Sequence, residues 1–144
     1  MPPPAQNKVD AAFIRSSSSL VSNNILDIGA PAGSARNPRL FEFVKKSGRG
    51  TGLTNGVVTT INATVDVVYD EGECLGTVSF IGQAIIEGDA GQNFAFCGDS
   101  GSPVVSTSNQ PVGLLFAAVL GGPAPFAVMN PLPEVLTQLN VQLF

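Results

Sequence analysis

A serine between two glycines is the clearest candidate for chemistry in this chain of 144 residues. The run GDSGSP at 98–103 places the hydroxyl of Ser100 on a tight turn, with apolar residues before and after it. A serine nucleophile needs N–H groups that hold a developing oxyanion, and the amides of Gly98 and Ser100 can supply two. The ordinary alternative is a turn that only joins two strands. We interpret the run as a displayed nucleophile, with Asp99 tied down by an amine or by backbone donors.

The other groups that such a nucleophile requires are incomplete. A serine hydroxyl is activated by an adjacent base, and the sequence contains no histidine. The cysteines, Cys74 and Cys97, match no metal-ligand spacing, so we expect structural or free thiols and leave a disulfide between them open. We therefore expect no metal site and no cofactor. The glycine cluster at 48–52 predicts a strand-end turn rather than a phosphate loop, because β-type sequence follows it instead of a helix.

Composition favours an all-β fold. Charged residues make up 12% of the chain and hydrophobic residues 44%, with 16 Gly and 11 Pro. Short strands rich in Val, Ile, Thr and Phe, cut by Gly, Asn and Pro, fit this composition better than long amphipathic helices. The net charge of −4 and the lack of a basic run argue against nucleic acid as a partner.

Neither a membrane segment nor an export signal is expected. No apolar run reaches the ~18 residues of a membrane span. Residues 1–8 lack an apolar stretch flanked by basic residues, which is the pattern of a signal peptide. The default compartment is therefore the cytoplasm, and the compartment of the intact protein stays open.

The elements that must carry the serine turn are short strands. A strand is predicted over 40–45, and Asn55-Gly56 predicts a two-residue hairpin turn. Alternating apolar and polar residues over 57–69 predict a strand with one face in the core. Pro133 suits the first turn of a C-terminal helix. The residues that give this helix its spacing are Val135, Leu136, Leu139 and Leu143.

Three stretches together resemble the trypsin-like (chymotrypsin-fold) serine peptidases, bacterial members in particular. Besides GDSGSP, residues 44–58 are similar to the opening hairpin of that family's C-terminal barrel, and 112–116 to its substrate-lining strand. The resemblance implies an all-β fold, a six-stranded Greek-key barrel of the trypsin type over 40–144 with a short C-terminal helix. Residues 1–39 would then be an N-terminal arm and linker, the remnant of a first barrel.

The resemblance also implies roles for individual residues. Ser100 would attack the substrate carbonyl, and the amides of Gly98 and Ser100 would hold the oxyanion. Residues 9–14 are similar to the stretch that carries the family's catalytic aspartate, which implies that Asp10 orients the base. The residues expected along the substrate approach are Phe94, Ala95, Phe96 and Phe116.

Two hypotheses for function follow. In the first, the chain is part of a serine endopeptidase for peptide or protein substrates, and its histidine comes from a missing N-terminal barrel or a companion chain. Alone it would be inactive, and an apolar or small substrate side chain is expected because no acid lies in the approach. In the second, it is a non-catalytic binding or assembly module. In both, an uncovered apolar face predicts a homo-oligomer.

Overall fold

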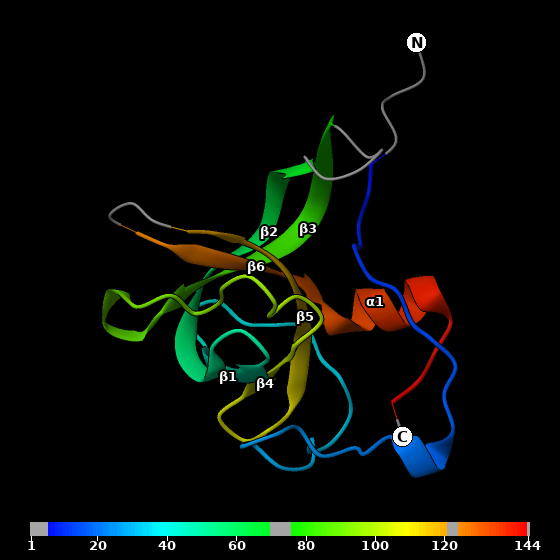
Figure 1. Ribbon diagram of the computed structural model, residues 1–144. Coiled ribbons are helices and arrows are strands. Elements are labelled where there is room, and N and C mark those ends of the chain that lie inside the picture. Colours follow the sequence, from blue (N-terminus) through cyan, green and yellow to red (C-terminus); the bar gives the residue numbers. More distant parts are fainter. Residues whose placement is uncertain (1–5, 70–75, 121–123, 144) are drawn as a thin grey trace.

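The structure is a computed structural model that describes residues 6–69, 76–120 and 124–143. Its centre is a closed barrel of antiparallel strands in the order β1-β2-β3-β6-β5-β4 (Figure 1). The expected all-β fold, a six-stranded barrel with one short C-terminal helix, is confirmed. The elements are η1 (Ser18–Leu20), β1 (Phe43–Gly48), β2 (Gly52–Tyr69), β3 (Gly76–Gly88), η2 (Asp89–Gly91), β4 (Pro103–Ser106), β5 (Pro111–Val119), β6 (Phe126–Pro131) and α1 (Leu132–Leu139).

The barrel closes because every strand contributes apolar side chains to one interior cluster. Burial of a large aliphatic or aromatic side chain stabilises the folded state by roughly 1.5–3 kcal/mol. The cluster therefore gives the serine turn a rigid base. Its members are Val44, Val58, Ala84, Ile86, Phe94, Ala95, Val104, Val112, Leu115, Ala127 and Met129.

The hairpin turn predicted at Asn55-Gly56 is wrong. Both residues lie inside the uninterrupted strand β2, and the chain reverses instead at 49–51, in the predicted glycine-rich turn. Gly56 is needed for packing, since a Cβ there would collide with the carbonyl of Glu87 and lie 2.8 Å from the ring of Phe94. The glycine of this Asn-Gly pair is therefore required by the close approach of neighbouring segments and not by a turn.

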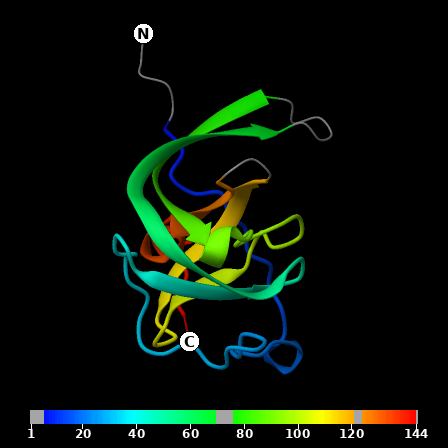
Figure 2. The same ribbon diagram turned by 90° about the vertical axis from the view of Figure 1, so that its left-hand side faces the viewer.

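Strands β2 and β3 form a long bent pair whose far ends extend beyond the rest of the barrel (Figure 2). The predicted alternation holds over 63–69, where odd-numbered residues are half-buried and even-numbered ones exposed. Nearer the barrel the buried residues are Gly56 and Val58, so the parity is reversed. Register shifts between Val58 and Val65 account for the change, because each bulge moves the following side chains to the other face.

Helix α1 packs against strands β5 and β6. Pro133 lies in its first turn as predicted, and Leu132 and Val135 are buried. The helix ends at Leu139 because Asn140 is left-handed, with φ of 52°, so Leu143 lies beyond it. Among the described residues, no helix has both the length and the apolar character needed to cross a bilayer.

The residues before β1 form an extended arm along the barrel, past α1 (Figure 1). Asn7 pairs in parallel with Phe80 of β3. At the other end of the arm, Arg36 forms an ion pair with Glu42 just before β1. Much of the arm between these points is exposed, including several large apolar side chains. The boundary predicted at 39/40 stays a prediction.

Candidate active site

The turn that carries Ser100 is built from left-handed glycines and pinned to β5. Gly98 and Gly101 have φ of 93° and 87°, a region that side chains other than glycine rarely adopt. The amide of Gly101 donates to the carbonyl of Leu115 at 2.8 Å, and the amide of Leu115 donates to the carbonyl of Ser102 at 3.0 Å. Within the described ranges, the amides of Gly98 and Ser100 donate to no protein group. Both predicted oxyanion donors are therefore available to a ligand.

Asp99 anchors this turn from below and is fully buried. Its carboxylate accepts from the amides of Gly50 at 2.7 Å, Thr51 at 3.1 Å and Phe96 at 2.9 Å, and from the Thr51 hydroxyl at 2.7 Å. The Nζ of Lys46 lies 3.2 Å away. Burial alone would raise the pKa of Asp99, but the bonds from Thr51, Phe96 and Lys46 outweigh it and lower the pKa to about 2. The prediction that an amine or backbone donors hold Asp99 is confirmed, and both kinds of donor are present.

Lys46 is the partner that sequence reasoning did not identify. It is fully buried, donates to the carbonyl of Gly52 at 3.0 Å and to the Thr51 hydroxyl, and lies 5.9 Å from the centre of the Phe94 ring. The available signal was its position in β1, because Lys46 shares the inward face with Val44. A lysine on a core face needs a buried carboxylate.

The glycines at 48 and 50 allow the β1–β2 turn to lie directly against Asp99. A Cβ on Gly48 would collide with the Asp99 carboxylate, and one on Gly50 would lie 2.5 Å from the carbonyl of Cys97. This turn then supplies the donors of Gly50 and Thr51 described above. The cluster belongs to the support of the serine turn.

Ser100 itself is exposed, and its hydroxyl donates to the backbone carbonyl of Phe116 at 3.2 Å. A carbonyl oxygen orients the hydroxyl but is far too weak a base to take its proton, so this contact does not activate Ser100. A cavity of about 240 Å³ opens beside the hydroxyl. Its lining is Val67, Ala95, Phe96, Cys97, Ser100, Leu115, Phe116, Ala117, Ala118 and Leu120.

Three of the four residues predicted along the substrate approach line this cavity: Ala95, Phe96 and Phe116. Phe94 does not line it, because its side chain is 1% exposed and belongs to the core cluster beneath the turn. Cys97 joins the lining with an exposed, free thiol, while Cys74 lies outside the described residues. Over 6–69, 76–120 and 124–143, no cluster of His, Cys, Asp and Glu could hold a metal ion.

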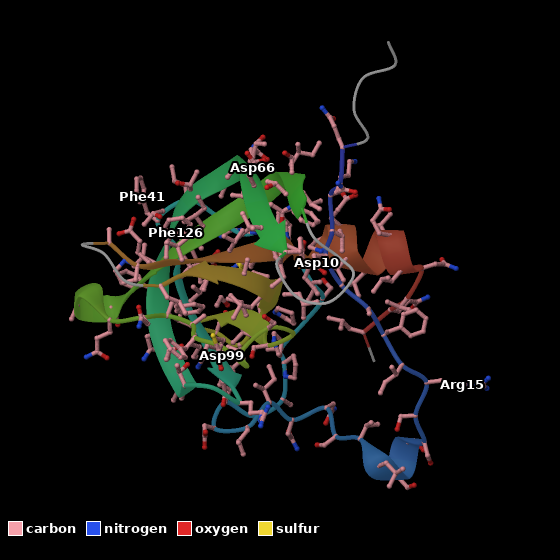
Figure 3. All side chains as sticks on the ribbon, turned by 45° about the horizontal axis from the view of Figure 1, so that its top comes forward. Asp10, Arg15, Phe41, Asp66, Asp99 and Phe126 are labelled. Carbon is pink, nitrogen blue, oxygen red and sulfur yellow. The ribbon has the colours of Figure 1, made fainter. Side chains whose placement is uncertain are left out.

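Asp10 lies on the arm and is held by Asn130 of β6. Its amide donates to the side-chain oxygen of Asn130 at 3.1 Å, and the Asn130 Nδ2 donates back to the Asp10 carbonyl at 2.9 Å. The same Nδ2 lies 3.4 Å from the carbonyl of Leu114, two positions before the Phe116 carbonyl that holds Ser100. Among the described residues, Asp10 is therefore linked to β5 by hydrogen bonds only through the side chain of Asn130, which lies in β6. Figure 3 shows Asp10 beside the barrel, whereas Arg15 projects away from it on the arm.

The comparisons with known proteins agree with this geometry. The chain aligns over 83% of its length with a glutamic acid-specific serine protease that uses a histidine triad in substrate binding, at 25% identity and a TM-score of 0.62. Cellulomonas bogoriensis chymotrypsin aligns over 84% at 20% identity and 0.62. Thermobifida fusca protease A aligns over 83% at 23% identity and 0.60. The chain spans only 57–60% of the length of these structures.

No curated protein sequence is significantly similar to the chain. The sequence model described as Trypsin, in contrast, matches residues 3–137, nearly the whole chain. The match covers the Asp10 segment, the glycine-rich turn and the Ser100 turn together. The chain therefore belongs to the trypsin family.

Proposed function

We propose that this domain supplies the nucleophile and oxyanion hole of a serine endopeptidase. One observation carries the proposal: Ser100 is exposed on a turn locked by a buried Lys46–Asp99 pair. The amides of Gly98 and Ser100 have no acceptor among the described residues. In acyl transfer, the Ser100 Oγ–carbon bond forms as the hydroxyl proton passes to a base. The peptide C–N bond then breaks as that proton passes to the leaving amine.

The base would come from outside these residues. The sequence has no histidine, and the Ser100 hydroxyl rests on a carbonyl that cannot accept its proton. The aligned proteases are longer than the part that this chain spans, which is 57% and 60% of their length. We therefore propose that a histidine carried by an N-terminal barrel or by a companion chain enters between Asp10 and Ser100.

The arm carries exposed apolar side chains that could bind the histidine-bearing barrel or companion chain. Phe13, Ile14, Leu20 and Leu26 are 63%, 90%, 80% and 75% exposed. Large apolar side chains exposed at several positions along one arm are a surface that a partner can cover. The arm would pack against the histidine-bearing part, and in its absence against a second copy of the chain.

The cavity beside Ser100 favours a small apolar substrate side chain. Apart from Ser100 and Cys97, its lining residues are apolar, and none carries a charge. An acidic or basic side chain would lose its hydration there without gaining a partner. The glutamate preference of the aligned protease is therefore not expected here.

The test uses purified chain, casein and a fluorophosphonate probe that reacts with activated serines. The chain alone should neither digest casein nor be labelled stoichiometrically at Ser100. Adding a histidine-bearing partner should produce labelling that Ser100→Ala abolishes. Stoichiometric labelling without a partner would contradict the external base, and partner-dependent labelling that survives Ser100→Ala would contradict the nucleophile.

A non-catalytic binding or assembly module is the second candidate. The contact between the Ser100 hydroxyl and the Phe116 carbonyl favours it, because a turn kept only for structure would satisfy its hydroxyl in this way. Such a module would bind peptides equally well before and after Ser100→Ala and would never acquire probe labelling.

A further inference from the structure

The hydroxyl of Tyr69 makes an unexpected contact with the predicted catalytic aspartate. Tyr69 is the last residue of β2, at the far end of the β2–β3 pair, and its hydroxyl donates to Oδ2 of Asp10. The two residues are 59 positions apart, so only the fold brings them together. Both are half-buried.

The surroundings of the Tyr69 phenol agree with this contact. Burial raises its pKa, and the hydrogen bond and negative charge of Asp10 raise it further, well above the ordinary range. The phenol therefore remains a donor at every pH at which a serine protease works. The Oδ2 atom of Asp10 therefore keeps the Tyr69 hydroxyl as its donor throughout this pH range.

Asp10 is held by its backbone and its side chain through different elements. Asn130 of β6 is fully buried and clamps the Asp10 amide and carbonyl together. These two bonds place the Cα but leave the carboxylate free to rotate. The Tyr69 hydroxyl removes that freedom by engaging Oδ2. Oδ1 accepts no hydrogen bond from the described residues, so it can accept a further donor.

We infer that Tyr69 is a positioning residue that sets the orientation of the Asp10 carboxylate towards the incoming base. The inference rests on the proposed function, in which Asp10 orients a histidine from outside the chain. Tyr69 touches neither substrate nor base in this role. It acts through Asp10, by presenting one oxygen to the imidazole N–H while holding the other.

The first test is spectroscopic and needs no catalysis. Tyr69 is the single tyrosine and the chain has no tryptophan, so the ultraviolet absorbance of phenolate reports on this residue alone. In the wild-type chain phenolate should form only at strongly alkaline pH. Asp10→Asn keeps both backbone bonds to Asn130 and should lower the Tyr69 pKa towards its ordinary value.

A matched control comes from the same strand pair. Asp66 accepts a hydrogen bond from the Ser79 hydroxyl on the exposed face, so Asp66→Asn removes a carboxylate from β2 without touching Asp10. The Tyr69 titration should not change in this variant. A wild-type phenol that titrates at its ordinary pKa, or an Asp10→Asn curve identical to wild type, would overturn the contact.

The second test supplies the base as free imidazole. Ser100 Oγ attacks the phosphorus of a fluorophosphonate, fluoride leaves, and imidazole takes the hydroxyl proton. Tyr69→Phe should lower the imidazole-saturated rate of Ser100 labelling roughly tenfold, the weight of one hydrogen bond to a charged group. Ser79→Ala, which removes a comparable hydroxyl–carboxylate bond, should leave the rate unchanged.

The outcomes separate the two proposals. If imidazole promotes no labelling of wild-type Ser100 while the Tyr69 titration depends on Asp10, the proposed catalysis fails and the contact stands. Equal or faster labelling of Tyr69→Phe would overturn the positioning role, and faster labelling would identify Tyr69 as a competitor of the base.

Discussion

Two carboxylates belong to the proposed site, and the structure holds them in opposite ways. Asp99 is fully buried and receives bonds from the β1–β2 turn, from Phe96 and from Lys46. Asp10 is half-buried on the arm, and the described contact of its carboxylate is the Tyr69 hydroxyl. The serine turn is therefore complete within one barrel, while the aspartate side is open to a further partner.

The largest effect should come from the buried pair. Lys46→Met leaves Asp99 buried without its cation, which should lower the free energy of unfolding by about 3 kcal/mol. Chemical denaturation measures this loss. The neighbouring Lys45 is only half-buried, and Lys45→Met should change stability by less than about 0.5 kcal/mol. Equal losses in both variants would show that the pair does not support the turn.

Acid should release the same anchor. The pKa of Asp99 is lowered from its ordinary 3.8 to about 2, so its contribution is complete above about pH 4 and lost as the pH falls through 2. The shift corresponds to roughly 2 kcal/mol. Urea unfolding across this window measures the slope, which Asp99→Asn should flatten. An unchanged slope in that variant would assign the acid sensitivity to other groups.

A smaller effect should follow from removing one donor of the anchor. Thr51→Val deletes the hydroxyl that bonds Asp99 at 2.7 Å, which should cost about 1.5 kcal/mol because the acceptor is charged and buried. Thermal or chemical unfolding measures the difference. Thr60 is exposed on β2, so Thr60→Val is the matched change and should be close to neutral.

The arm should show the reverse behaviour, with little effect on folding and a clear effect on association. Phe13 and Ile14 are 63% and 90% exposed, so replacing both with Ser should change the unfolding free energy by less than about 0.5 kcal/mol. Light scattering should show the wild-type chain as an oligomer and the variant as a smaller species. A wild-type monomer at working concentration would contradict the apolar interface.

Features coded by neighbouring residues could be read from the sequence. The Ser100 turn, the glycine-rich strand end at 48–52 and the start of the C-terminal helix all depend on local backbone preferences. The all-β class followed from composition and from the short spacing of turn residues. The need of Asp99 for donors followed from the cost of burying a charge.

Only the tertiary structure decided which residues meet across the barrel. Three results depend on residues that lie far apart along the chain: the pairing of Lys46 with Asp99, the burial of Phe94 in the core rather than in the cavity, and the contact of Tyr69 with Asp10. Asn-Gly by itself predicts a turn, but Gly56 lies inside a strand. Glycine is required there because the Glu87 carbonyl and the Phe94 ring occupy the space that a Cβ would need. Local preference is worth about 1 kcal/mol or less per residue, and close packing and buried charge outweigh it.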